Sequence, residues 1–278
     1  MRSLSMEIAK VAAGEQRQVA DMVAIEEPLE IRLAWSTPKG RATRSISITM
    51  RTPGNDNELA AGFLFTEGII KGRCDIDAIE TCGPPAPGSG LHNVVRVELQ
   101  QDVSVDLGRL QRHFYTTSSC GVCGKASLDA LRVAGHEPLA TGVTVSTSAL
   151  TSIPDKLRAS QGTFDATGGL HAAATFNSEG QLGPVMEDVG RHNAVDKVIG
   201  RMLLDDMLPA SNSGMMVSGR ASFELVQKSL VAGIPLLAAV SAPSSLAVSL
   251  AREFNMTLVG FLRGSTYNVY SAPERLVS

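Results

Sequence analysis

The chain has 278 residues, of which 44% are hydrophobic and 19% are charged, and its formal net charge is -3. This length suits one large domain or two modest ones, with enough apolar material for a buried core. The low charged fraction argues against long disordered tails, and the near-balanced charge excludes a chain-wide field that would draw the protein to nucleic acid or to an anionic membrane.

The N-terminal residues, MRSLSMEIAKVAAGEQRQ, lack the uninterrupted apolar core of a signal peptide, and the longest apolar run, around 234–240, is broken by Pro235. No segment approaches the roughly 20 apolar residues that a membrane-spanning helix needs. The four cysteines, at positions 74, 82, 120 and 123, do not have the spacing of a secreted disulfide framework. We therefore expect a cytoplasmic protein without a nucleic-acid or membrane partner.

Residues 1–22 are polar and weakly patterned, which predicts a loose lead-in to a strand-rich domain over 23–114. The segments LEIRLAW, RSISITM and HNVVRVELQ alternate apolar and polar residues, as half-buried strands do. One helix is predicted in NDNELAAGFLFTEGII, with Asn55 and Glu58 placed to cap its start and Gly68 to end it. This domain is expected to be a small α+β unit.

Residues 127–278 have the pattern of a layered α/β domain. AAATF and LGPVMEDV, joined by the turn NSEGQ, predict a β-hairpin, and RHNAVDKVIGRML has apolar residues at helical spacing. The strands predicted in GMMVS, IPLLAAVS and MTLVGFL are continuously apolar and alternate with helical segments. Strands of this kind belong to a parallel arrangement that helices cover on both faces.

Three of these strands end in polar loops, at 218–220, 241–245 and 261–266. Ligands of open α/β sheets bind outside the carboxyl ends of the strands, and loops rich in Gly, Ser, Thr and Arg suit a phosphate-bearing ligand such as a nucleotide. Position alone makes Ser218, Arg220 and Ser244 candidate ligand-binding residues. The alternative is that these are ordinary polar loops. Neither a Walker loop nor a GxGxxG turn is present, so an NTPase or a dehydrogenase is not supported.

A second polar cluster, EDVGRHNAVDK, lies between the predicted hairpin and the helix. His192 and Asp196 are four residues apart and share a helix face, so the carboxylate could orient the imidazole, and His192 is a further candidate ligand-binding residue. The alternative is a solvated helix start with an intrahelical pair. His171, at the start of a predicted strand, is interpreted as structural.

Cys120 and Cys123 form a C-x-x-C pair in the polar segment 115–126, which is expected to be a mobile loop. A structural zinc site would need a second pair of ligands, so no metal site is predicted. A thioredoxin-type pair would follow a strand and begin a helix, whereas a mobile thiolate suits a carrier that visits more than one partner. Spacing alone leaves a redox pair, a sulfur carrier and a chance pair open.

The motifs of the chain resemble, in order and spacing, those of the formate dehydrogenase accessory sulfurtransferase family, the FdhD/NarQ family. The resemblance covers about residue 24 to the C-terminus and is carried by TTSSCGVCGK, TGGLHAAA, EDVGRHNAVDKVIG, SGRASFELVQK, SAPSSLAV and GFLRGSTYNVY, with ELAAGFLFTEGII upstream. It implies a cytidine-deaminase-like C-terminal domain, with a mixed sheet and helices on both faces. The positions of the deaminase zinc ligands hold no cysteine and no Ala-Glu pair, so deamination is not expected.

The resemblance also implies a function. Members of the family accept a persulfide sulfur from a cysteine desulfurase and pass it to the molybdenum bis-guanine-dinucleotide cofactor before this enters formate dehydrogenase. The match places the persulfide on Cys120, with Cys123 as its partner, and makes the cofactor a bound substrate. The matching cofactor-binding segment consists of Phe261, Leu262, Arg263, Gly264, Ser265 and Thr266. Relatives imply a homodimer. A cofactor-binding chaperone without sulfur chemistry and a thiol-disulfide oxidoreductase remain alternatives, and no role is assigned to Cys74 or Cys82.

Overall fold

The computed structural model describes residues 2–86, 89–103, 105, 137–140 and 142–278. The predicted mobile segment 115–126, with Cys120 and Cys123, lies outside the described residues. In the described part the chain is a mixed α/β protein with a four-stranded sheet, a six-stranded sheet and two smaller two-stranded pairings.

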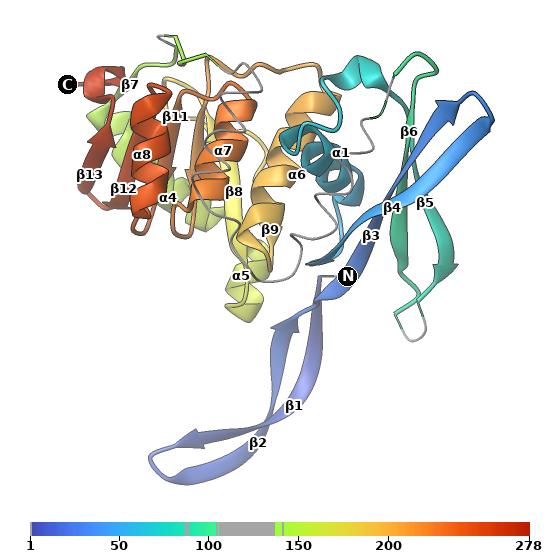
Figure 1. Ribbon diagram of the computed structural model, residues 1–278. Helices are drawn as coiled ribbons and strands as arrows, with labels where there is room; N and C mark the ends of the chain where they lie inside the picture. Colours follow the sequence, from blue (N-terminus) through green and yellow to red (C-terminus); the bar gives the residue numbers. More distant parts are fainter. Residues whose placement is uncertain (1, 87–88, 104, 106–136, 141) are drawn as a thin grey trace.

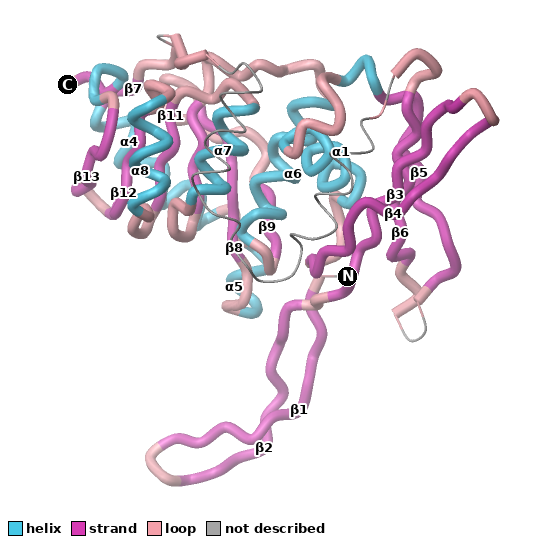
Figure 2. Tube along the Cα trace, viewed as in Figure 1, coloured by secondary structure: helices cyan, strands magenta, loops and turns pink. Residues whose placement is uncertain are grey.

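The N-terminal segment forms a long β-hairpin, so the prediction of a loose lead-in over 1–22 is wrong. β1 (Ser3–Ala12) pairs antiparallel with β2 (Glu15–Ala24), and the hairpin extends away from the rest of the molecule (Figures 1 and 2). Ala13 and Gly14 turn the chain with φ of 50° and 84°, the positive values that a two-residue type I′ turn requires. The hairpin escaped prediction because its turn lacks the usual Asn-Gly or Asp-Gly signal.

A four-stranded sheet with one helix follows the hairpin, and it contains the three strands predicted in this region. Its strands, in the spatial order β4-β3-β6-β5, are β3 (Glu27–Thr37), β4 (Gly40–Arg51), β5 (Ile76–Pro85) and β6 (His92–Leu99). The predicted helix is α1 (Asp56–Thr66), and a short 3-10 turn, η1 (Arg73–Asp75), precedes β5. Leu59 and Leu64 of α1 pack on Ile31 and Val97 of the sheet. Asn55 occupies the N-cap position but makes no side-chain cap bond there.

The six-stranded sheet is mixed, in the order β13-β12-β11-β10-β8-β9. Its strands are β8 (His171–Phe176), β9 (Met186–Asp188), β10 (Gly214–Val217), β11 (Leu236–Ala239), β12 (Thr257–Arg263) and β13 (Thr266–Ser271). β10, β11 and β12 are parallel, while β8 pairs antiparallel with both β9 and β10. The predicted hairpin and the three predicted parallel strands are therefore confirmed.

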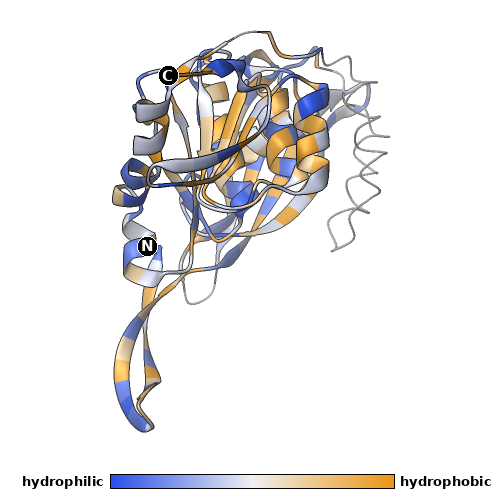
Figure 3. Ribbon diagram, turned by 90° about the vertical axis from the view of Figure 1, so that its left-hand side faces the viewer, coloured by the Kyte–Doolittle hydropathy of each residue, from blue (hydrophilic) through white to orange (hydrophobic). Residues whose placement is uncertain are grey.

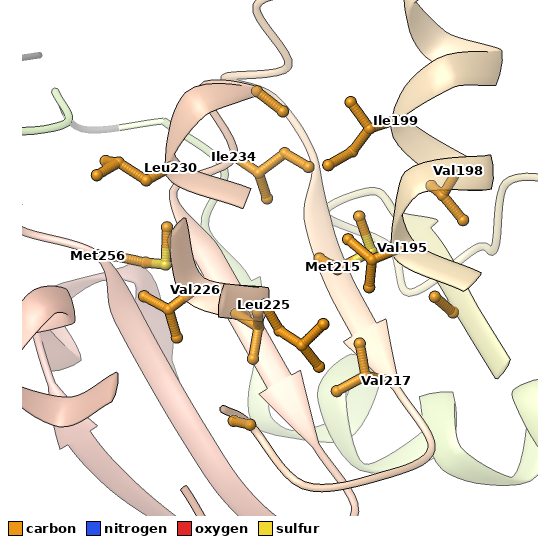
Figure 4. Packing of buried hydrophobic residues seen from close by; sticks show 14 of the residues in the cluster. Val195, Val198, Ile199, Met215, Val217, Leu225, Val226, Leu230, Ile234 and Met256 are labelled. Carbon is orange, nitrogen blue, oxygen red and sulfur yellow. The ribbon is translucent and has the colours of Figure 1, made fainter. Parts of the chain in front are cut away.

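Helices cover both faces of this sheet, as the continuous apolar strands predict. The remaining elements are β7 (Val145–Ser146), α4 (Thr147–Ala159), α5 (Gly162–Thr167), α6 (Arg191–Leu204), α7 (Phe223–Val231), α8 (Ser245–Glu253), η2 (Pro273–Arg275) and β14 (Leu276–Val277). Met215 and Val217 point into the core shared with α6 and α7 (Figure 4), whereas Met216 points into the core with α4. The strands are accordingly mainly orange, the colour of hydrophobic residues, in Figure 3.

Helix α6 of the large sheet also packs against α1 of the small one, backbone to backbone. A Cβ atom on Gly200 would overlap the carbonyl oxygen of Glu58, and one on Gly62 would overlap the carbonyl oxygen of Asp196. The two glycines therefore set how closely the helices approach. None of the helices in the described part of the chain is long and apolar enough to cross a membrane.

A buried ion pair lies at the start of α6, between the same two sheets. Lys197 Nζ is 2.6 Å from Asp188 Oδ2, and the two side chains are 1% and 0% exposed. Lys197 also donates to the carbonyl oxygen of Thr52, whose own N–H donates to Asp188 Oδ2 at 3.2 Å. The end of β4 is thereby fixed to the junction of β9 and α6.

Candidate functional site

The parallel strands end at a cavity of about 580 Å³. Its wall is formed by the strand ends at Ser218, Val240 and 262–264, by α4 and α5, and by the segment 168–171. The cavity thus brings Ser218, from the predicted loop 218–220, together with Leu262, Arg263 and Gly264 from the predicted loop 261–266. The carboxyl edge of the sheet is where ligands of open α/β sheets bind.

Near its end, β12 presents a strained aromatic residue beside this cavity. Phe261 has a φ of 55°, in the left-handed region that β-branched and bulky residues rarely adopt, and its side chain is 41% exposed. The pairing of β12 with β13 shifts between Gly260 and Arg263, and Arg263 Nε donates to the carbonyl oxygen of Val240 at 3.0 Å. Strain of this kind persists where the surrounding structure holds it in place, and it concentrates at ligand-binding sites.

The other predicted loop residues contribute less directly to the cavity. Ser265 lies in the β12–β13 turn and Thr266 begins β13, but neither lines the cavity wall. The side chain of Ser244 accepts a hydrogen bond from the N–H of Ala247 and caps α8. A helix cap accounts for this serine, so its assignment as a ligand residue has no geometric support. Ser218 lines the cavity while its hydroxyl oxygen accepts from the N–H of Ala172 at 2.8 Å.

The wall made by α4 and α5 was not anticipated from the sequence. The Arg158 guanidinium lies 4.7 Å from the centroid of the Phe164 ring and forms an ion pair with Asp165. Glu187 accepts hydrogen bonds from the N–H groups of Thr163 and Phe164, at 3.1 and 2.8 Å, and so fixes the start of α5. These residues belong to no recognisable motif, and the glycines at 168 and 169 are the only local hint that the chain turns there.

His192 does not pair with Asp196. The expected contact is therefore wrong both as a carboxylate that orients the imidazole and as a solvated intrahelical pair. His192 Nε2 lies 3.2 Å from Glu224 Oε2 and 3.5 Å from the Ser222 hydroxyl. Asp196 instead lies buried, 2.9 Å from Lys228 Nζ, and also accepts from the hydroxyl of Thr66. The carboxylate faces α1 and α7 because a buried charge needs a buried partner there. Burial lowers the pKa of Lys228, but the carboxylates of Asp196 and Glu67 outweigh it and leave that pKa raised.

The contact with His192 lowers the pKa of the Glu224 carboxyl to about 2. Because this pKa lies below its ordinary value, the contact stabilises the fold above about pH 4.5 and this contribution is lost as the pH falls toward 2. In the His192→Gln variant we expect the carboxyl carbon of Glu224 to titrate near the ordinary value of about 4.3, as measured by carbon-13 NMR. An unchanged midpoint would show that His192 does not hold this carboxylate.

His171 lines the cavity, although the sequence suggested only a structural role. It lies opposite Asp188 in the β8–β9 pairing, and a Cβ atom on Gly219 would come within 3.2 Å of its Nδ1. Burial lowers the pKa of His171, and the nearby positive charge of Arg191 acts in the same direction. The histidine therefore links the cavity to the start of α6.

Two of the cysteines are described, and both lie far along the chain from the cavity-lining residues: Cys74 is exposed, and Cys82 is partly exposed on β5. Cys120 and Cys123 lie outside the described residues. Within the described ranges, no group of three His, Cys, Asp or Glu side chains is arranged to hold a metal ion.

Comparison with known proteins gives matches over nearly the whole chain. The FdhD/NarQ family model matches residues 24–277. The chain is 52% identical over 272 residues to a protein of Streptomyces coelicolor named sulfur carrier protein FdhD, with 97% of this chain and 94% of the relative covered. A protein of the same name from Saccharolobus solfataricus is 42% identical over 276 residues, with 99% of both chains covered.

A solved structure has a similar fold. It is a crystal structure from Desulfotalea psychrophila, named as a formate dehydrogenase accessory protein. The two folds superpose with a TM-score of 0.77 at 28% sequence identity, and the match covers 100% of both chains. The whole described arrangement therefore recurs in a relative.

Proposed function

The chain belongs to the FdhD/NarQ family, and from this premise we propose that it is a sulfur carrier that acts in the maturation of formate dehydrogenase. The observation that carries the proposal is the 52% identity, over nearly the full length, to a protein named as a sulfur carrier. The C-x-x-C pair of Cys120 and Cys123 in the sequence supplies the sulfur chemistry that such a role needs.

The proposed reaction has two steps at Cys120. Its thiolate attacks the outer sulfur of a persulfide on a cysteine desulfurase, the donor cysteine leaves as a thiolate, and Cys120 becomes the persulfide. The carried sulfur then passes to the molybdenum bis-guanine-dinucleotide cofactor, the substrate of the transfer. Release of the sulfur as sulfide requires two electrons, which Cys123 supplies if its thiol forms a disulfide with Cys120.

We further propose that the cavity at the strand ends receives the guanine nucleotide end of that cofactor. Its volume of about 580 Å³ falls within the roughly 300–1,000 Å³ of small-molecule sites. Leu157, Phe164 and Leu262 give it an apolar wall suited to a base, and the end of β12 with Phe261 and Arg263 stands at its edge. The same proposal includes a cytidine-deaminase-like arrangement of the C-terminal layers and a homodimeric assembly.

Mass spectrometry of the full chain after incubation with a cysteine desulfurase and cysteine tests the sulfur step. We expect one labile added sulfur on Cys120, lost on treatment with a reductant and absent from Cys120→Ala. The Cys74→Ala variant is the matched control and should take up sulfur as the unmodified protein does, because Cys74 is not part of the pair.

Two other outcomes would contradict the proposal. If formate dehydrogenase activity persists in cells whose only copy is Cys120→Ala, the protein is a cofactor-binding chaperone that needs no sulfur chemistry. If no persulfide forms but a Cys120–Cys123 disulfide cycles with thioredoxin, the protein is a thiol-disulfide oxidoreductase.

A further inference from the structure

The hairpin of β1 and β2 leaves the body of the molecule as a two-stranded ribbon (Figures 1 and 2). In the described part of the chain its strands pair only with each other, over ten residues each. From Glu15 to Met22, β2 is exposed apart from the partly buried Val19. A lone two-stranded ribbon is at best marginally stable in water, and its outer edges carry unpaired N–H and C=O groups. A further strand on one edge would satisfy these groups and stabilise the ribbon.

The hairpin also exposes large apolar side chains. Of the ten such side chains that are exposed in the described part of the chain, four lie on the hairpin, and they are from 36% to 65% exposed: Leu4, Met6, Val11 and Met22. Apolar residues that gather on one exposed element mark an interaction surface. The charged residues of the hairpin have both signs, so they do not favour a strongly acidic or a strongly basic partner.

The outer edge of β2 has its backbone groups placed to accept a strand. The two-residue turn makes Ala12 and Glu15 a hydrogen-bonded pair, and hydrogen-bonded and non-hydrogen-bonded pairs then alternate along the ladder. The N–H and C=O groups of the even-numbered residues of β2, from Gln16 to Met22, therefore point away from β1. The N–H of Met22 accordingly donates to Asp21 Oδ1 at 2.9 Å, as expected for a group on the free edge.

The charges of β2 are poorly matched inside the hairpin. Arg17 lies opposite the like charge of Lys10, and its exposed ion pair at 2.9 Å is with Glu15 of its own strand. Asp21 lies opposite Met6 and forms no ion pair with a residue that the structure describes. Like charges directly opposite each other destabilise a sheet, and exposed ion pairs contribute little. An acidic residue beside Arg17 and a basic residue beside Asp21, on the free edge, would improve both.

The strand that supplies this order of charges is β2 itself. When a two-fold axis relates two copies of one edge strand, the strands are antiparallel and the same faces stay together, so odd-numbered residues oppose odd-numbered ones. With Val19 at the axis, Arg17 lies opposite Asp21 of the second copy, and Asp21 lies opposite Arg17 of the second copy. Gln18 then lies opposite Ala20, and both have outward N–H and C=O groups, so the ladder hydrogen bonds can form.

Neighbouring registers lose this match. An axis at residue 18 would place Asp21 opposite Glu15, which has the same charge, and an axis at residue 20 would place both charged residues opposite valines. An axis at residue 17 or 21 would bring two identical charges together. Charge complementarity therefore selects the register centred on Val19.

We propose that β2 is an interface between two copies of this chain, whose hairpins join through residues 15–23 into one four-stranded antiparallel sheet centred on Val19. The inference rests on the homodimeric assembly included in the proposed function, to which it gives a contact, but not on the sulfur step. Residues 15–23 precede those that the family model matches, 24–277. The pairing of one short strand buries less than the roughly 1,600 Å² of a standard interface, so we expect a dimer that dissociates on dilution.

Cysteine cross-linking of the full chain tests the position of the axis. Val19 would meet its own copy at a non-hydrogen-bonded position, where opposite Cα atoms are about 4.5 Å apart, within the range of a disulfide. On oxidation, Val19→Cys should therefore give a tryptic peptide 18–32 joined to a second copy of itself, as detected by mass spectrometry. Ile8→Cys is the matched control, because Ile8 lies opposite Val19 on the same face but on β1, away from the proposed interface. Its peptide should form no such product.

Charge reversal tests the register. Arg17→Asp and Asp21→Arg each create two pairs of like charges across the interface, so each should weaken self-association about tenfold in sedimentation equilibrium. An equimolar mixture of the two variants should associate again, because each supplies the charge that the other has lost. Neither change places a like charge opposite within the hairpin, where Arg17 faces Lys10 and Asp21 faces Met6. The control Glu7→Lys, on β1 of the same hairpin, should leave self-association unchanged.

The outcomes separate the interface from the assembly and from the sulfur step. A cross-link at Val19 together with recovery in the mixture would support the interface. A dimer that persists in both reversal variants, or that gives no cross-link at Val19, would overturn it and show that the homodimer uses another surface. Loss of association in both variants without recovery in the mixture would overturn the register. A chain that stays monomeric at every concentration would overturn the interface and the homodimer, whereas the persulfide on Cys120 is measured separately.

Discussion

Replacing Gly200 with alanine is expected to lower the free energy of unfolding by about 3 kcal/mol or more, the upper end of what overpacking a core costs. The added Cβ would overlap the carbonyl oxygen of Glu58 in α1. Because the obstacle is backbone, no side-chain rotation relieves the overlap. The better helix propensity of alanine, worth about 1 kcal/mol over glycine, is too small to compensate.

The helices can accept the methyl group only by moving apart, and that movement would also disturb the hydrogen bonds between them. Thr66 at the end of α1 donates to Asp196 of α6, and Lys228 of α7 donates to both. Separation of α1 from α6 would stretch these buried hydrogen bonds, each of which is costly to leave unmade. The effect of one methyl group should therefore spread to the junction between the two sheets.

Urea unfolding followed by circular dichroism measures the change for Gly200→Ala and for Gly62→Ala. The matched control is Gly162→Ala, since a Cβ at Gly162 meets no atom within 4 Å. The control should be neutral or slightly stabilising. The two close-contact variants should be non-additive when combined, because the first already separates the helices. Wild-type stability in Gly200→Ala would show that α1 and α6 do not pack backbone to backbone.

The sheet was predictable because a run such as GMMV, residues 214–217, has no polar side chain, as is typical of a strand that is covered on both faces. Met215 and Met216 do point into different cores. The hairpin of β1 and β2 was not predictable, because its alternation is diluted by Ser, Glu and Lys and its turn is Ala13-Gly14. A turn that is defined only by its positive φ values is hard to recognise in the sequence when alanine occupies one of its two positions.

The candidate site was partly predictable for a similar reason. Strand ends of a parallel sheet meet at one edge, so Ser218 and Arg263 could be placed together without any contact information. The cavity wall at Arg158 and Phe164 could not be predicted, and neither could the pairing of His192 with Glu224. Both join segments that only the tertiary structure brings together. Helical spacing favoured Asp196 as the partner of His192, but the buried Lys228 held that carboxylate instead.

Replacing Lys197 with methionine is expected to lower the free energy of unfolding by about 3–5 kcal/mol, the cost of leaving one charge of a buried pair alone. Asp188 is fully buried and lies 2.6 Å from Lys197 Nζ. It would keep hydrogen bonds from the N–H groups of Thr52 and Gly190, but these carry no compensating charge. The loss of the ammonium also frees the carbonyl oxygen of Thr52.

Thermal and urea unfolding of Lys197→Met, compared with Lys39→Met, measure this effect. Lys39 lies in the exposed turn between β3 and β4, and its replacement should change stability by less than about 0.5 kcal/mol. Adding Asp188→Asn to Lys197→Met should recover part of the loss, because a buried amide costs less than a buried carboxylate. If Lys197→Met alone is as stable as the control, the ion pair does not hold the start of α6 against β4.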